Sequence, residues 1–266
     1  MTVRVRTLCS GSSGNATMVS DGATRFLVDC GVRAQRRLRQ MLLDHASEGP
    51  PLSAVVVSHL HSDHICYASL RVFEALGIEV YVHQDNTAGL ARRHFFGRPF
   101  AGLRVRTFGD EPFRVGSFLV RPLPVRHAPR MTTHAFSITR SEGGRTVRVG
   151  VATDLTGGES VAEQFADSDL ICLEANHDPA LLKANPNPNS AYHMENSRAA
   201  RLLLDALRLS ARPPLAVLLA HLSDERNTPE IALAAMRKVL DEAGHQGLRL
   251  VAAPRFQPSV EFVLGR

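Results

Sequence analysis

The sequence predicts an α/β protein, a four-layer αββα sandwich in which two mixed β-sheets pack together and helices cover them on the outside. Short apolar runs typical of strands occur in both halves of the chain, and helical segments lie between these runs in both halves. This order of elements is typical of sheets covered by helices. No long linker separates the halves, so the 266 residues are predicted to form a single domain, residues 1–266.

The first half opens with three β-type runs separated by turn-forming residues, GSSGN at 11–15 and Asp21-Gly22. This pattern predicts an opening β-meander. The apolar run at 54–57 predicts a buried strand, because four apolar residues follow one another without a polar face. The elements expected in this half are strands at 3–8, 17–20, 26–29, 54–57 and 79–82, helices at 33–44, 65–76 and 86–93, and further strands between 105 and 151.

The second half repeats this order. We expect strands at 169–174 and 215–220 and helices at 195–207 and 228–242. The segment NPNPNS at 185–190 is rich in turn-forming residues, and we expect it to form a loop at the rim of a site.

Composition is that of an ordinary globular protein, with a net charge of +5 and a pI near 9.4. Only two of the basic residues are lysines, Lys183 and Lys238. The basic balance favours anionic partners, nucleic acid among them, but an arginine-rich composition is also produced by a GC-rich coding bias. The sequence leaves both explanations open.

Targeting and redox signals are weak. No apolar run approaches the roughly 18 residues of a membrane helix, and the first ten residues lack the pattern of a secretory signal. We therefore expect a cytoplasmic protein that has no membrane partner, and no obligate protein partner is evident. The four cysteines have no CxxC spacing, so we expect reduced, buried thiols.

Potential metal ligands concentrate in SHLHSDH at residues 58–64, directly after a buried strand and before a helix. His59 and His61 would point to the same side if the strand continued, and a turn would bring Asp63 and His64 to a neighbouring point. Imidazole and carboxylate ligands together suit zinc, manganese or iron. The cluster therefore predicts two adjacent divalent metal ions that form a hydrolytic centre.

The motif His-x-His-x-Asp-His after an apolar strand resembles the signature of metallo-β-lactamase-fold hydrolases. The resemblance implies further site residues along the chain. Asp29, after the strand FLV, matches the aspartate that braces the metal loop, and His127 matches a later histidine ligand. Asp154, in GVATD, matches the aspartate that bridges the two metals, and His221 matches the final histidine.

Three phrases resemble one branch of this family, the YycJ/VicX-like (WalJ-like) proteins, from Ser10 nearly to the end of the chain. They are SGSSGNAT at 10–17, LEANHD at 173–178, and AHLS at 220–223 with NTPE at 227–230. The resemblance implies a bacterial, cytoplasmic, nuclease-like phosphodiesterase, and the activity associated with the branch is 5′-directed exonuclease activity on DNA.

The chain departs from the branch pattern at two places. Ala128 and Pro129 follow His127 where the branch usually has an aspartate, so His134 is a second candidate for the same ligand. The loop AYHMEN at 191–196 keeps His193 but replaces its usual neighbours. This second departure bears on substrate details near the loop.

The predicted roles divide the site into two metal positions and an acid. One metal is assigned to His59, His61 and His127. The other is assigned to Asp63, His64 and His221, with Asp154 bridging both. The metals would lower the pKa of a water from 15.7 to about 7, which supplies hydroxide as the nucleophile. Asp63 is expected to orient that hydroxide, and His193 to act as the general acid that protonates the leaving group.

Other residues have a structural and a functional interpretation. Ser12, Ser13 and Asn15 could contact a substrate phosphate, or their loop could be only a glycine-rich hairpin turn. His177 is expected behind the ligands in a supporting role. A group of arginines at 33–39 could touch a phosphate, but a solvated helix face is the favoured interpretation.

Three functions fit these features. The first is a two-metal phosphodiesterase or nuclease acting on DNA. The second is a hydrolase of a small thioester or lactam, which the same metals could serve by Lewis-acid activation. The third is a non-catalytic binding module, which a missing ligand would have favoured. Fold alone does not choose among them.

Overall fold

The computed structural model describes residues 1–157 and 159–265, and one of its two seven-stranded sheets contains the predicted meander. The strand order in this sheet is β14-β1-β2-β3-β4-β5-β6. Strands β14, β1, β2 and β3 pair antiparallel, and β3 to β6 pair parallel, which confirms the meander. The strands are β1 (Val3–Cys9), β2 (Ala16–Ser20), β3 (Arg25–Val28), β4 (Ala54–Val56), β5 (Glu79–His83), β6 (Arg104–Phe108) and β14 (Phe262–Leu264).

The other sheet has the order β13-β12-β11-β10-β9-β8-β7. Its strands β10 to β13 pair parallel, and β7 pairs antiparallel with β8. Both sheets are therefore mixed, as predicted. The strands are β7 (Phe113–Val115), β8 (Phe118–Val125), β9 (Thr133–Glu142), β10 (Arg145–Ala152), β11 (Leu170–Glu174), β12 (Ala216–Ala220) and β13 (Leu250–Ala252).

Most predicted helices are present, with small shifts at their ends. The predicted helix at 65–76 begins at Tyr67, because Cys66 is the capping residue and its backbone NH donates to the Ser69 hydroxyl oxygen. Two short helices, α4 and α5, were not predicted, since six or seven residues show little periodicity. The helices are α1 (Gln35–Asp44), α2 (Tyr67–Leu76), α3 (Thr87–His94), α4 (Glu159–Phe165), α5 (Pro179–Ala184), α6 (Asn196–Arg208) and α7 (Pro229–Glu242), with 3₁₀ turns at Ala46–Glu48, Gln84–Asn86 and Pro188–Tyr192.

The chain divides into two compact units, which are described separately. The first unit contains Met1–Pro122, Arg140–Thr146 and Pro254–Arg266, and the second contains Leu123–Thr139 and Val147–Ala253. The single domain expected over residues 1–266 stays a prediction.

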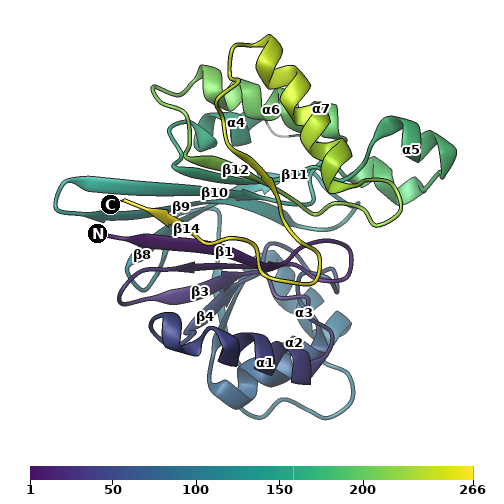
Figure 1. The fold of residues 1–266 in the computed structure, drawn as a ribbon. Coiled ribbons are helices and arrows are strands. Elements are labelled where there is room, and N and C mark those ends of the chain that lie inside the picture. Colours follow the sequence, from purple (N-terminus) through teal and green to yellow (C-terminus); the bar gives the residue numbers. More distant parts are fainter. Residues whose placement is uncertain (158, 266) are drawn as a thin grey trace. The chain divides into compact units, whose positions relative to one another are not determined.

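In the first unit, the parallel strands β3 and β4 are buried along their whole length. Every residue of β3 and β4 is buried, and these strands consist almost entirely of apolar residues, as expected where helices cover a sheet. Figure 1 shows α1, α2 and α3 beside these strands. From α2, Leu70 and Phe73 are fully buried and are spaced for one face of the helix.

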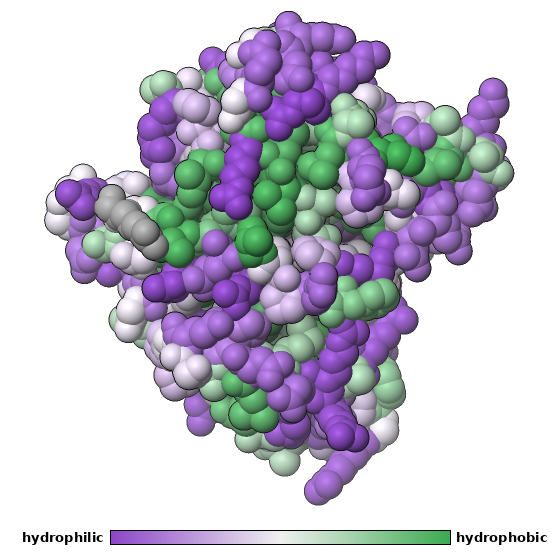
Figure 2. Space-filling view, in the orientation of Figure 1, coloured by the Kyte–Doolittle hydropathy of each residue, from purple (hydrophilic) through white to green (hydrophobic). Residues whose placement is uncertain are grey.

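In the second unit, α4, α6 and α7 share one hydrophobic core with the parallel strands (Figure 1). From α7, Ala232, Met236 and Leu240 enter this core at intervals of four residues, so one stripe of the helix is apolar. Figure 2 shows hydrophilic residues at the top of the view, around the carboxyl end of α7, and hydrophobic residues below them. The amphipathic helix thus fixes the sheet from which the site residues project.

Among the described residues, no helix combines the length and the apolar character that a membrane span requires.

Gly31 lets the segment after β3 lie against the loop that carries the predicted metal ligands. A Cβ atom on Gly31 would lie 1.9 Å from the backbone oxygen of Asp63, closer than any real contact. Two hydrogen bonds join the same segments, from the Asn15 NH to the Asp63 carbonyl (2.8 Å) and from the Cys30 NH to the His64 carbonyl (2.7 Å). Only glycine permits this approach.

We predict that Gly31→Ala destabilises the protein, because the clash involves backbone on both sides and no flexible side chain can move away. The expected loss is about 1–3 kcal/mol or more. Thermal unfolding and bound metal should both be measured. Gly22→Ala is the matched control, because nothing lies within 4 Å of a Cβ at Gly22. An unfolding midpoint equal to that of the parent in Gly31→Ala would refute the argument.

Candidate metal centre

The loop that carries the ligands of the first unit consists of turns. Strand β4 ends at Val56, so the expectation that His59 and His61 alternate on a continuing strand is wrong. Instead the NH groups of His64 and Ile65 both donate to the His61 carbonyl, at 2.9 and 3.0 Å. The chain leaves the strand after residue 56 and turns at residues 62–64, and this turn gathers the side chains of the motif.

Asp29 holds this loop from the end of β3. Its carboxylate accepts hydrogen bonds from the Ser58 NH (2.7 Å), the Ser58 hydroxyl (2.8 Å) and His64 Nδ1 (2.8 Å). Asp29 is buried and has a φ of 60°, a strained conformation for a residue other than glycine. The contacts are those expected of the bracing residue, a role that stays a proposal.

His59 and His61 direct ring nitrogens at each other. His59 Nε2 lies 2.9 Å from His61 Nδ1, and His59 Nδ1 lies 3.0 Å from the Ser58 hydroxyl. His64 lies beside this pair, its ring centroid 4.2 Å from that of His59, and His64 Nε2 lies 3.6 Å from an Asp63 carboxylate oxygen. The structure thus brings together the four predicted ligands of the motif.

The three predicted phosphate contacts have different environments. Ser12 and Ser13 are exposed. Asn15 is buried, and its amide group hydrogen-bonds Gly11 and the Asp63 carbonyl and lies 3.2 Å from His64 Nε2. Asn15 therefore supports the ligand loop, and only the two serines are open to a ligand from solvent.

The second unit places two of its predicted ligands at the carboxyl ends of parallel strands, where ligands commonly bind in such sheets. Asp154 lies two residues after β10, and His221 directly after β12. Both are buried and both have positive φ angles, 59° and 54°. His221 Nδ1 lies 2.7 Å from an Asp154 carboxylate oxygen. Strain at both residues is the cost of turning their side chains inward.

Glu174, at the end of β11 between those two strands, was not predicted. Its side chain is fully buried, and its carboxylate accepts from His193 Nδ1 at 2.8 Å and from His221 Nδ1 at 2.9 Å. It also accepts from the backbone NH groups of Leu155 and Met194. A signal was present in the sequence, because Glu174, like Asp29, is an acidic residue at the end of an apolar strand.

Glu174 and His193 form an ion pair. Burial acts to raise the pKa of Glu174, but the charge of His193 and hydrogen bonds from His193 and His221 outweigh it and lower this pKa to about 2. Burial likewise acts to lower the pKa of His193, but the charge of Glu174 and hydrogen bonds to Asp154 and Glu174 raise it to about 9. His193 is therefore a protonated imidazolium near neutral pH.

His127 follows β8 and meets the same group of residues. Its Nδ1 donates to the Tyr192 carbonyl at 2.8 Å, and its Nε2 lies 3.9 Å from an Asp154 oxygen. His134, the second candidate, is a buried residue of β9. The contact with Asp154 supports His127 as the ligand.

The ring nitrogens of four histidines are arranged in the same way. In His59, His64, His127 and His221, Nδ1 contacts a protein oxygen, which leaves Nε2 as the atom that can bind metal. Metal-binding histidines commonly donate their other nitrogen to a carboxylate or carbonyl in this manner. Each unit thus offers imidazole nitrogens together with a carboxylate, that of Asp63 in the first unit and that of Asp154 in the second, and donors of these two kinds fit a divalent metal.

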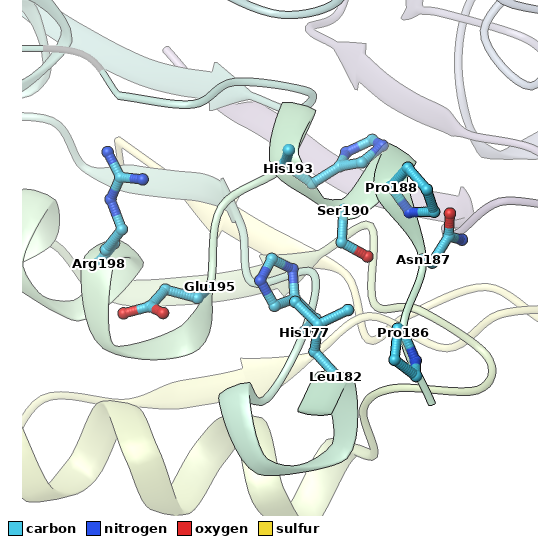
Figure 3. A pocket seen from close by; sticks show the side chains of 10 residues that line it. His177, Leu182, Pro186, Asn187, Pro188, Ser190, His193, Glu195 and Arg198 are labelled. Atoms are coloured by element: carbon cyan, nitrogen blue, oxygen red, sulfur yellow. The ribbon is translucent and has the colours of Figure 1, made fainter. Parts of the chain in front are cut away.

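The second unit also contains a cavity of about 470 Å³ to which His193 contributes (Figure 3). His177 lines it as well, with Glu195 and Arg198 from the start of α6. Burial lowers the pKa of His177, so this imidazole is neutral. The remaining lining residues are Leu182, Pro186, Asn187, Pro188, Ser190 and Ala191, which confirms that the predicted loop at 185–190 lies at the rim of a cavity.

Comparison with known proteins gives the same fold. The β-lactamase superfamily domain model matches residues 24–219. Exodeoxyribonuclease WalJ of Streptococcus pneumoniae is 25% identical over 254 residues, covering 89% of this chain and 87% of the relative. Exodeoxyribonuclease YycJ of Bacillus anthracis is 26% identical over 256 residues, covering 89% of each.

Among solved structures, the metallo-β-lactamase fold protein YhfI from Bacillus subtilis has a TM-score of 0.71 at 20% identity, covering 99% of this chain and all of the other. The predicted α/β fold class and the resemblance to the YycJ-like branch are thereby confirmed. The chain belongs to the β-lactamase superfamily domain family and is a metal-dependent hydrolase of the metallo-β-lactamase fold.

Proposed function

We propose that this hydrolase is a two-metal phosphodiesterase that cleaves nucleic acid, with DNA as the favoured substrate and a 5′-directed exonuclease as the favoured mode. The observation that carries the proposal is the His193–Glu174 ion pair, which adjoins predicted metal ligands and borders a cavity. The names of the relatives WalJ and YycJ, both exodeoxyribonucleases, support this substrate class.

The ligand set is the one that the sequence predicts, namely His59, His61, Asp63, His64, His127, Asp154 and His221. Two divalent ions, zinc or manganese with iron as an alternative, would supply an activated water and neutralise the phosphate oxygens. Asp63 is only partly buried and is the ligand that we expect to orient the attacking water.

His193 is the proposed general acid. Its Nδ1 donates to Glu174, so Nε2 is the atom that delivers a proton to the leaving oxygen. Glu174 acts through His193 as a positioning residue, because its buried carboxylate fixes the ring and keeps it protonated. An alkoxide leaving group, such as the sugar oxygen of a nucleotide, needs this proton, which is why the pair favours a phosphodiester.

The cavity beside His193 has the polarity that a sugar phosphate requires. Its lining includes the imidazole of His177, the guanidinium of Arg198 and the hydroxyl of Ser190. Arg198 is held by a hydrogen bond from its guanidinium to the Thr156 carbonyl at 2.6 Å. A thioester or lactam hydrolase would need a more apolar pocket, since drug-sized and cofactor sites are mostly apolar.

Removal of metal should abolish hydrolysis, and added manganese or zinc should restore it, because carboxylate and imidazole ligands hold exchangeable metal. The assay offers 5′-phosphorylated single-stranded and duplex DNA, RNA, a thioester and a lactam. Asp63→Ala serves as the control for contaminating nucleases. Full activity in metal-free protein would contradict the proposal, and hydrolysis of only the thioester or lactam would replace its substrate class.

Asp29→Asn should weaken metal binding by about 10–100-fold, because an amide cannot hold the His64 Nδ1–H and the Ser58 groups as the carboxylate does. Metal titration with an equilibrium dialysis readout measures this change. Asp44→Asn, at an exposed position on α1, is the matched control. Equal affinity in Asp29→Asn and the parent would remove Asp29 from the supporting role.

His193→Ala should keep both metals and slow cleavage of a nucleotide bond by about 10²–10⁴-fold, the usual contribution of a general acid. A nitrophenyl phosphodiester should be affected much less, since nitrophenolate leaves without a proton. Glu174→Gln should show the same preference for the activated substrate, and its pH profile should shift toward acid as the His193 imidazolium loses its partner.

Metal analysis of both variants decides among the alternatives. Loss of metal from His193→Ala would make His193 a ligand, which its place among Asp154, Glu174 and His221 also permits. Equal slowing of both substrates would assign His193 a positioning role.

A further inference from the structure

Three arginines and a phenylalanine of the first unit gather beside the metal-ligand loop. Arg33 precedes α1, Arg37 lies in its first turn, and Arg255 and Phe256 belong to the segment before β14. We call these four residues the arginine–phenylalanine clamp. None of them belongs to the predicted ligand set.

The arginines surround a small cavity of about 120 Å³. Its lining comprises Cys9, Ser13, Gly14, Val32, Arg33, Ala34, Arg37 and Arg255. No carboxylate is among these residues of the described chain, and burial raises the pKa of Cys9 to about 11, against the effect of Arg37, so the thiol is neutral. Three arginines therefore line a cavity whose size suits a phosphoryl group, not a whole nucleotide.

Helix α1 begins at this cavity without a cap. Ala34 is its N-cap residue, no side chain accepts from the first-turn amides, and the first turn contains no acidic residue. Alanine is among the least favourable residues at this position. Because the helix dipole is positive here, an anion in the cavity would add to the attraction of the three guanidinium groups.

Phe256 gives the clamp an aromatic surface. Its side chain is 62% exposed, and the guanidinium carbons of Arg37 and Arg255 lie 5.5 and 6.0 Å from its ring centre. Arg37 also donates to the Phe256 carbonyl at 3.1 Å, which fixes this segment on α1. An exposed ring among arginines is the arrangement on which unpaired bases stack in proteins that bind single strands.

The clamp is connected to the ligand loop. Arg33 donates to the Ser62 hydroxyl at 3.1 Å, and Ser62 lies between His61 and Asp63. A phosphate bound by Arg33 would therefore lie beside the residues that are expected to hold metal. The arginines at 33–39 are all exposed, as the favoured interpretation of a solvated helix face expects, and two of them in addition contact Ser62 and Phe256.

We propose that the arginine–phenylalanine clamp binds one backbone phosphate and one unpaired base of a single-stranded nucleic acid that enters the site. This proposal rests on the proposed function, because it assigns to that reaction a substrate with an accessible single strand. Phosphate contacts supply affinity without regard to sequence, and stacking adds a preference for strands that carry bases.

Equilibrium binding separates the two contacts. Fluorescence anisotropy is measured with a 5′-phosphorylated oligonucleotide whose phosphorothioate linkages resist hydrolysis, and with an abasic strand of the same length and charge. Phe256→Ala should weaken binding of the base-containing strand by about 5–150-fold and leave the abasic strand unaffected. Arg37→Ala and Arg255→Ala should weaken both strands, and Arg37→Ala should lower the salt dependence by about 0.7 for one lost phosphate contact.

Two exposed residues outside the clamp provide matched controls. Arg36→Ala removes the same charge from the same helix, and Phe96→Ala removes a ring that is 59% exposed. Both should bind as the parent does. Two results with the variants would overturn the clamp: equal weakening of binding by Arg36→Ala and Arg37→Ala, or no effect of Phe256→Ala on the base-containing strand. A competition result would also overturn it. This is the case if an acidic peptide of equal charge displaces the base-containing strand as readily as the abasic strand.

Cleavage assays keep this proposal separate from the proposed function. If the predicted binding pattern appears and no nucleic acid is cleaved, the clamp stands and the proposed function fails. If the parent cleaves DNA and the clamp variants bind and cleave as the parent does, the clamp fails and the proposed function stands.

Discussion

The candidate site depends on one kind of interaction, in which a histidine Nδ1–H group donates a hydrogen bond to a buried carboxylate. Asp29 fixes His64 in the first unit, and Glu174 fixes His221 and His193 in the second. Each buried carboxylate sits at the end of a parallel strand, where its remaining oxygen lone pairs meet backbone NH groups. The carboxylates thereby set the tautomer of each ring and decide which nitrogen faces a metal or a substrate.

This arrangement costs conformational energy that the rest of the fold has to offset. Asp29, Asp154 and His221 all adopt positive φ angles, which cost roughly 1–3 kcal/mol at each residue. The fully buried strands β3, β4, β11 and β12 supply the stability, because their apolar residues are removed from water on both faces. The strained residues keep their conformation because the buried strands that precede them hold the backbone in place.

The same chemistry gives the two proposed substrate contacts different roles. The His193–Glu174 pair is buried and its charges are balanced within the protein, so it is suited to moving a proton at a defined atom. The arginine–phenylalanine clamp is largely exposed and three arginines line its cavity, so it is suited to a phosphate that arrives from solvent. Proton transfer is thus assigned to a buried pair of opposite charges, and binding of the nucleic-acid strand is assigned to exposed arginines.

The sequence by itself determined the order of strands and helices and the ligand motif at 58–64, because apolar runs and clustered histidines are local signals. The resemblance of the surrounding phrases also pointed to Asp29, Asp154 and His221, whose roles stay predictions. Only the tertiary structure decided the conformation of the ligand loop, since its turn at 62–64 is held by hydrogen bonds from the backbone NH groups of Asn15 and Cys30. Glu174 and the clamp were missed for the same reason: their partners lie 19 to 219 residues away in the sequence, and side chains so far apart meet only when the sheet and its helices are assembled.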